Sequence, residues 1–242
     1  MRISVVGLGY VGLPLAIECA KSGYQVNGID VDSKLITKLN DKKFFSNVAF
    51  KNRFKRNIDI SFHSQYIHLN NSDVILICLP TPLTSHGKPD LKILNESFSK
   101  IKKFVKPKTL IILESTVNPG LTRSLEKLFP KCDIAFSPER IDPLNKKWDV
   151  KNTPKLVAGL TDKARDRAVE FYSKFIDTVI PCSSLEVAET AKLLENSFRL
   201  INISFINELA IFCNKIGIDV QEVIKAASTK PYGFMPFYPS IG

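Results

Sequence analysis

The chain has 242 residues, 44% hydrophobic and 24% charged, an ordinary globular composition with room for one large domain and a smaller piece. No apolar run approaches the ~20 residues that span a bilayer, and the N-terminus lacks the pattern of a cleavable targeting segment. We therefore expect a cytoplasmic protein with no membrane partner. The formal net charge of +10 is compatible with nucleic acid, a membrane surface or an anionic small substrate.

The densest basic stretch, residues 42–56, interleaves lysine and arginine with phenylalanine, as some nucleic-acid-binding surfaces do. A solvated connection with a few buried aromatic side chains produces the same pattern more often, so we expect no nucleic-acid partner. The five cysteines are scattered and form no C-x-x-C pair, and only three histidines accompany them. We therefore expect no metal site.

Residues 2–20 predict a strand, a tight turn and a helix in succession. Gly7, Gly9 and Gly12 stand at G-x-G-x-x-G spacing directly after the apolar run 3–6. In a dinucleotide site the first glycine permits the turn, the second lets the backbone approach a pyrophosphate, and the third lets the helix pack close to the strand. The start of the helix offers free N–H groups to the phosphates.

An acidic residue ends the next predicted strand. Asp30 follows the run 24–29 and lies eighteen residues after Gly12. A carboxylate at this place accepts hydrogen bonds from a ribose 2′-hydroxyl and repels a 2′-phosphate. The position therefore favours NAD over NADP.

Strand-like and helical segments alternate after this unit, which predicts an α/β fold: a Rossmann-like, doubly wound parallel sheet covered on both faces. We expect strands at 3–6, 24–29, 58–62, 73–79, 109–113, 133–136, 155–158 and 178–180. We expect helices at 11–20, 32–40, 91–105, 119–129 and 162–175.

Residues 184–216 predict one long helix that is apolar on more than one face, which indicates burial between domains or between two subunits. Gly217 ends this helix, and Asp219 caps a short helix up to Ala227. We expect a dinucleotide-binding domain over 1–182 and, over 183–242, a helical dimerisation segment. The homodimer would form through the helix from Ser184.

Polar side chains follow three of the predicted strands. Thr81 follows one, Ser115 and Thr116 the next, and Glu139 with Arg140 the third. Because ligands of open α/β sheets bind at the carboxyl ends of the strands, these groups are candidates to meet a cofactor and a reacting group. Turn formation and helix capping explain each of them singly.

The long helix carries a second candidate group. Lys192, Asn196 and Arg199 lie at i, i+4 and i+7 and so share one stripe, with apolar residues around them. A solvated stripe has the same spacing. If the helix is substantially buried, as its apolar residues indicate, a lysine there needs an anion or a developing oxyanion beside it.

Together these residues resemble the UDP-glucose/GDP-mannose dehydrogenase family, the nucleotide-sugar 6-dehydrogenases. The resemblance covers nearly the whole chain, and its SPERIDP, NISFINELA and KPYGFMPFYP segments are most similar to the branch that acts on UDP-N-acetylmannosamine or UDP-N-acetylglucosamine. The remaining motifs are GLGYVGL at 7–13, PTP at 80–82, ESTVNPG at 114–120 and ETAKLLEN at 189–196.

The resemblance implies oxidation of a sugar C6 alcohol to a carboxylate with NAD, for surface polysaccharide biosynthesis. By position, Lys192 and Asn196 match the pair that stabilises an oxyanion, Glu139 the acid that activates water, and Thr116 the hydroxyl that places it. Substrate binding is implied for Glu139, Arg140, Lys192, Asn196 and Arg199. The residues expected to bind NAD are Gly7, Gly9, Tyr10, Val11, Gly12, Asp30, Lys34, Pro80, Thr81 and Thr116.

The family's nucleophilic cysteine lies in a G-G-x-C-x-P-x-D motif, immediately after the point at which this sequence stops at Gly242. None of the five cysteines matches it, and the C-terminal UDP-binding domain is also absent. We therefore expect this chain to be a truncated form that binds NAD without itself completing turnover.

Two alternatives stay open. A β-hydroxyacid or 6-phosphogluconate-type dehydrogenase also uses a lysine and an asparagine four residues later, although Glu186 stands where that class usually has glycine. The second alternative is a non-enzymatic NAD-binding module that acts through its dimer helix.

Overall fold

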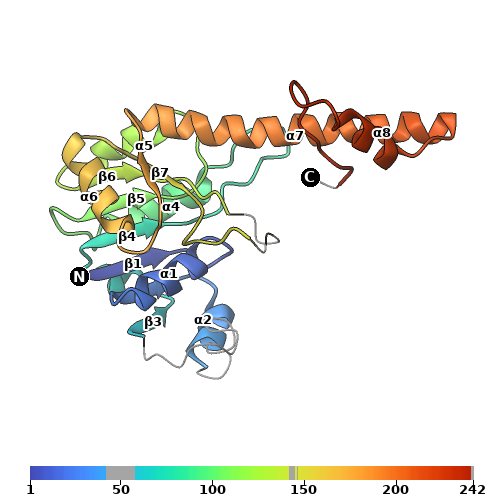
Figure 1. Ribbon diagram of the computed structural model, residues 1–242. Coiled ribbons are helices and arrows are strands. Elements are labelled where there is room, and N and C mark those ends of the chain that lie inside the picture. Colours follow the sequence, from blue (N-terminus) through green and yellow to red (C-terminus); the bar gives the residue numbers. More distant parts are fainter. Residues whose placement is uncertain (42–57, 142–144, 146, 241–242) are drawn as a thin grey trace. The chain divides into compact units, whose positions relative to one another are not determined.

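Eight short apolar strands pair edge to edge in a twisted sheet (Figure 1). The computed structural model describes residues 1–41, 58–141, 145 and 147–240. Two compact units, Met1–Thr190 and Ala191–Gly242, divide the chain. The sheet belongs to the first unit and has the order β3-β2-β1-β4-β5-β6-β7-β8. The strands are β1 (Arg2–Val6), β2 (Gln25–Ile29), β3 (Ile60–His63), β4 (Val74–Ile77), β5 (Leu110–Leu113), β6 (Asp133–Phe136), β7 (Lys155–Gly159) and β8 (Val179–Pro181).

The first six strands run parallel, so the ends of β2, β1, β4, β5 and β6 meet at one edge in that order. This confirms the predicted doubly wound α/β fold. One strand differs from the expected parallel arrangement, because β7 pairs antiparallel with β6, Phe136 opposite Ala158. The described part of the β6–β7 connection contains no helix, and a parallel pairing needs a crossover. β8 then pairs parallel with β7 after helix α6.

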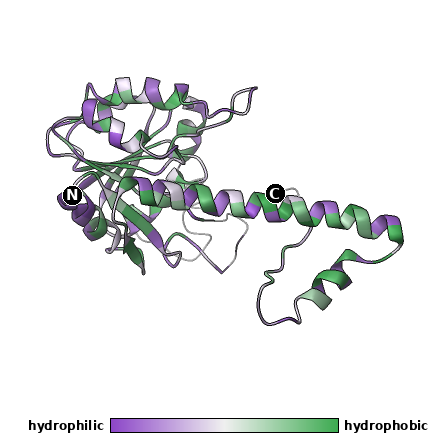
Figure 2. Ribbon diagram, turned by 90° about the horizontal axis from the view of Figure 1, so that it is seen from above, coloured by the Kyte–Doolittle hydropathy of each residue, from purple (hydrophilic) through white to green (hydrophobic). Residues whose placement is uncertain are grey.

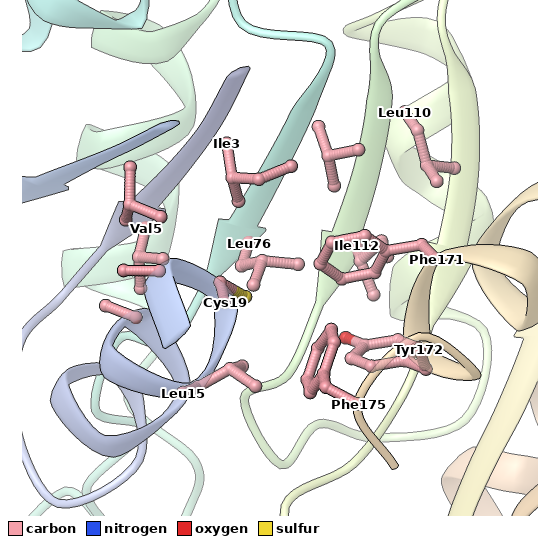
Figure 3. Packing of buried hydrophobic residues seen from close by; sticks show 14 of the residues in the cluster. Ile3, Val5, Leu15, Cys19, Leu76, Leu110, Ile112, Phe171, Tyr172 and Phe175 are labelled. Atoms are coloured by element: carbon pink, nitrogen blue, oxygen red, sulfur yellow. The ribbon is translucent and has the colours of Figure 1, made fainter. Parts of the chain in front are cut away.

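Helices cover both faces of the sheet. On one face α1 (Gly12–Lys21), α2 (Ser33–Asn40) and α6 (Asp162–Tyr172) pack on apolar side chains of β1, β4 and β5. Figure 3 shows this packing, with Leu15 and Cys19 of α1 and Tyr172 of α6 among the labelled side chains. The other face is covered by α4 (Lys92–Ile101), α5 (Leu121–Ser124) and the 3-10 turns η1 (Tyr66–Leu69) and η2 (Leu125–Lys127).

The predicted boundaries need small corrections. The strand expected at 73–79 is shorter, and Pro80 follows closely and cannot donate to a ladder. The helix expected at 91–105 ends at Ile101, and the one expected at 119–129 divides into α5 and η2. The basic stretch 42–56 lies outside the described residues.

The long predicted helix is present as α7 (Leu185–Ile216), and α8 (Val220–Ala227) follows it with Asp219 as N-cap. Gly217 takes a positive φ of 75°, which suits the end of a helix. Green and purple residues alternate along α7 in Figure 2, so its apolar residues are spread over its length. Leu194, Ile201 and Phe205 of α7 are 64–67% exposed in this chain, so the expected burial of the helix between domains or subunits stays a prediction.

Within the described ranges, no helix combines the length and the apolar character that a membrane crossing requires.

Candidate active site

The glycine loop between β1 and α1 has the close contacts that its spacing predicts. Gly7 has a φ of +90°, and a Cβ on Gly7 would stand 2.5 Å from the carbonyl oxygen of Cys78. A Cβ on Gly12 would stand 1.8 Å from the carbonyl oxygen of Gly7. Nothing lies within 4 Å of a Cβ built on Gly9, so open space adjoins the backbone there. This is the opening that a pyrophosphate needs.

Asp30 follows β2 and is joined to the glycine loop. Its Oδ2 accepts a hydrogen bond from the N–H of Leu8 at 2.7 Å, and its Oδ1 accepts one from the N–H of Asp32 at 3.0 Å. The side chain is half-buried, and each oxygen keeps a lone pair for another donor. The carboxylate is therefore held in place at the rim of the loop and can still accept from a ribose hydroxyl.

A cavity of about 750 Å³ lies along this edge of the sheet, large enough for a dinucleotide. The residues that line it come from the ends of β1, β2, β4, β5 and β6, from η1 and from one face of α4. Among the residues predicted from the sequence, it is lined by Gly7, Gly9, Tyr10, Val11, Asp30, Pro80, Thr81, Ser115, Thr116 and Glu139.

Hydrogen bonds connect the loops after β4 and β5. Thr81 donates its hydroxyl to the carbonyl oxygen of Thr116 at 2.9 Å, and Ser115 donates to that of Leu79 at 2.7 Å. These bonds fix two neighbouring strand ends against each other. Thr116 itself lines the cavity.

Glu139 and Arg140 follow β6 and have different surroundings. Glu139 lines the cavity, and its Oε1 accepts from the N–H of Ile141. Arg140 is not part of the large cavity; its guanidinium donates to the carbonyl oxygen of Pro154 at 2.8 Å. Both residues also line a second, water-sized cavity with Lys155.

Glu114 lines the cavity but was not among the predicted site residues, although it belongs to the ESTVNPG motif. It follows β5 directly, and its side chain is fully buried. Lys155 donates to its Oε2 at 2.7 Å, and Tyr172 donates to its other oxygen. Burial raises the pKa of Glu114, and the charge of Lys155 opposes that rise. The position of Glu114 directly after an apolar strand was the feature of the sequence that could have indicated a site residue there.

Residues of η1 and α4 also line the cavity and were missed. Tyr66, Ser97 and Lys100 belong to this group, and Tyr66 donates to the hydroxyl of Ser97 at 3.1 Å. Tyr66 follows β3, the strand next to β2, so this group lies toward the Asp30 end of the edge. Their spacing is that of an ordinary amphipathic helix, which gave no indication of a site.

Besides Arg140, five predicted residues do not line the large cavity. Lys34 is exposed in α2, and its backbone N–H donates to the capping carboxylate of Asp32. Gly12 acts through the close packing of α1. The others are Lys192, Asn196 and Arg199, which lie on α7 within the second unit, Lys192 half-buried and the other two exposed.

The start of α7 is tied to α5 within the first unit. The carboxylate of Glu189 is fully buried and accepts from the N–H groups of Gly120 and Thr122 at 2.7 and 3.0 Å. Glu186 pairs with the Arg123 guanidinium at 2.6 Å, and that hydrogen bond lowers the pKa of Glu186 to about 2. These hydrogen bonds and this ion pair hold α5 and the first turns of α7 together.

Comparison with known proteins gives a consistent assignment. Residues 1–176 match the NAD binding domain of the UDP-glucose/GDP-mannose dehydrogenase family, and residues 186–242 match its central domain. The chain is 37% identical to the UDP-N-acetyl-D-glucosamine 6-dehydrogenase of Pseudomonas aeruginosa, over 100% of this chain and 59% of that protein. It is 36% identical to Protein CapL of Staphylococcus aureus, over 99% of this chain and 58% of that one.

A solved structure with a similar fold is the UDP-N-acetyl-D-mannosamine dehydrogenase of Pyrococcus horikoshii. The TM-score is 0.86 at 32% identity, covering 100% of this chain and 60% of that structure. The chain thus spans about three fifths of the length of the relatives that it matches. NAD is the cofactor of the domain matched by residues 1–176.

Proposed function

Because the chain belongs to the UDP-glucose/GDP-mannose dehydrogenase family, we propose that it serves in oxidising the C6 alcohol of a UDP-sugar to the uronate with NAD. The observation that carries the proposal is the large cavity at the carboxyl edge of the sheet. It combines an open glycine loop, a ribose-binding carboxylate at Asp30, and a hydroxyl and an acid at Thr116 and Glu139. NAD accepts a hydride when it is bound there.

The glycine loop and Asp30 bind different parts of the cofactor in this proposal. The N–H groups at the start of α1 and the open face of Gly9 receive the pyrophosphate, and Asp30 receives the hydroxyls of the adenosine ribose. Thr81 and Pro80 border the same cavity one strand further along. The fit of these residues to NAD rests on the tight contacts at Gly7 and Gly12 and the space at Gly9.

Thr116 and Glu139 act on water in this proposal. Both line the cavity at the ends of neighbouring strands β5 and β6. A carboxylate can take a proton from water, and a hydroxyl beside it can hold that water in position. Glu139 is the general base and Thr116 the positioning hydroxyl.

Lys192 and Asn196 stabilise the oxyanion in this proposal. They lie one helical turn apart on α7 and therefore present a cation and an amide on one stripe. Arg199 continues the stripe, and with Arg140 it contributes positive charge for a sugar nucleotide.

A UDP-N-acetylhexosamine is the proposed substrate, and surface polysaccharide biosynthesis is the proposed use of its uronate. Relatives named for UDP-N-acetyl-D-glucosamine and UDP-N-acetyl-D-mannosamine support the choice, at 33–37% identity for the bacterial and Pyrococcus proteins. The substrate stays a proposal because the chain covers only 58–59% of those relatives.

We also propose a homodimer through the helix from Ser184. Support comes from the apolar side chains that α7 leaves exposed, since contiguous exposed apolar surface marks interaction sites. The functional division proposed is a cofactor domain over 1–182 and a helical segment over 183–242.

The test is an assay of NADH formation. It uses the protein expressed from its whole gene, with UDP-N-acetylglucosamine, UDP-N-acetylmannosamine or UDP-glucose as substrate. We expect NADH and a uronate from a UDP-N-acetylhexosamine, and loss of both in Lys192→Ala with NAD binding retained. Reduction of NAD with a small hydroxy acid alone would contradict the proposal.

A further inference from the structure

A buried charge cluster forms part of the cavity wall and has no role in the function proposed above. Glu114, Lys155 and Tyr172 meet on the α6 side of the sheet, with Lys155 Nζ 2.7 Å from Glu114 Oε2 and 5.0 Å from the centre of the Tyr172 ring. The side chain of Lys155 is 10% exposed and that of Glu114 is 0% exposed. Burial of two charges is costly, and a pair of apolar residues often serves as well for stability.

Only the negative member of this pair borders the large cavity. Glu114 lines the cavity, whereas Lys155 lies behind it and lines the small water-sized cavity instead. Glu139, a second carboxylate, borders the same part of the wall. The charges nearest the cavity interior at this place are therefore negative.

The strand order locates this wall relative to the cofactor. Asp30 follows β2, the glycine loop follows β1, and Glu114 follows β5, with β4 between the last two. Neighbouring strands lie about 4.8 Å apart, so Asp30 and Glu114 are about 14 Å apart along the edge. With the adenosine ribose at Asp30 and the pyrophosphate at the loop, the nicotinamide falls toward Glu114.

We propose that Glu114 makes this site bind oxidised NAD more tightly, relative to NADH, than it would without the buried carboxylate. The inference rests on the proposed NAD site. The oxidised nicotinamide ring carries a positive charge and the reduced ring does not, so a carboxylate in the wall stabilises the oxidised form selectively. The charge of Lys155 favours the ionised form of Glu114, and the ionised carboxylate favours exchange of NADH for NAD.

The experiment measures the dissociation constants of NAD and NADH for the wild-type chain and for Glu114→Gln. We expect the ratio Kd(NAD)/Kd(NADH) to rise about fivefold in the variant, because the wall loses its charge and Lys155 is left uncompensated. Tyr172→Phe removes a hydrogen bond to the same carboxylate without changing charge, and we expect its ratio to stay at the wild-type value.

A second control tests whether the ratio depends on where in the cavity a negative charge is removed. Glu96→Gln removes a charge from the same cavity beside Ser97, toward the Asp30 end, and we expect no change in the ratio. If Glu114→Gln does not fold, Glu114→Gln/Lys155→Met removes the pair together, and we expect a ratio raised about twofold. A folded variant lacking Glu114 with an unchanged or lower ratio would overturn the inference while leaving the NAD site intact. Failure of the wild-type chain to bind either nucleotide would overturn both.

Discussion

The carboxylate of Asp30 accepts a hydrogen bond from the N–H of Leu8 at 2.7 Å, although the two residues come from different strand ends. Leu8 lies inside the glycine loop, between Gly7 and Gly9. The acid that recognises the ribose and the loop that receives the pyrophosphate are therefore one hydrogen-bonded unit. A change at Asp30 acts on both.

Replacement of Asp30 by alanine tests this unit. Asp30→Ala loses a charged acceptor worth about 1.5–3 kcal/mol, so we expect NAD to bind at least about tenfold more weakly. The preference for NAD over NADP falls as well, because the repulsion of a 2′-phosphate is gone. Calorimetric titration measures both affinities. The matched control is Asp32→Ala, which removes the cap of α2 and lowers stability without changing the NAD/NADP ratio.

Two glycines of the loop have separable roles. Gly12→Ala places a Cβ against the Gly7 carbonyl, so we expect a loss of at least about 2 kcal/mol of unfolding free energy. Gly9→Ala adds a methyl group to open space, so stability stays within about 1 kcal/mol while NAD binding weakens. Urea denaturation and NAD titration of the two variants distinguish these effects. Equal stability losses in both variants would argue against this division.

Glu189 stabilises the junction between α5 and α7. Glu189→Ala leaves the N–H groups of Gly120 and Thr122 without their acceptor, and we expect a loss of about 2–4 kcal/mol in the free energy of unfolding. Glu189→Gln keeps one acceptor and costs less. Glu208→Gln, an exposed position on the same helix, is the control and should be neutral. Chemical denaturation gives all three values, and a neutral Glu189→Ala would refute the role.

The Glu186–Arg123 pair makes a contribution that depends on pH. Its hydrogen bond lowers the pKa of Glu186 from 4.5 to about 2 in the folded chain. The stabilisation is therefore complete above pH 4.5 and is lost as the pH falls toward 2. We expect the small stability difference between wild type and Arg123→Met to shrink over that interval.

The same difference should shrink at high salt, because both side chains are solvent-exposed. Parallel urea titrations of the two proteins at several pH values measure it. A difference that stays constant down to pH 2 would show that Arg123 acts through packing instead.

The sequence predicted the sheet well because its strands are short, apolar and separated by glycine, proline or polar residues. The expectation that Thr81, Thr116 and Glu139 lie at one edge of the sheet followed from that alternation. The antiparallel direction of β7 could not be predicted in this way, because strand direction depends on the connection after β6 and not on the apolar pattern.

The residues that were missed share one physical property, which is that their partners are distant in sequence. The partner of Glu114 is Lys155, 41 residues away, and the partners of Glu189 are the N–H groups of Gly120 and Thr122. Helical periodicity predicted α7, but it could not distinguish a helix buried in its own chain from one with exposed apolar residues.

A crystal structure of the chain with NAD tests the central claim most directly. The account predicts NAD along the carboxyl edge of the sheet, with its pyrophosphate against Gly9, its adenosine ribose on Asp30 and its nicotinamide toward Glu114. NAD bound elsewhere, or bound in the reverse direction with the nicotinamide at Asp30, would contradict the account.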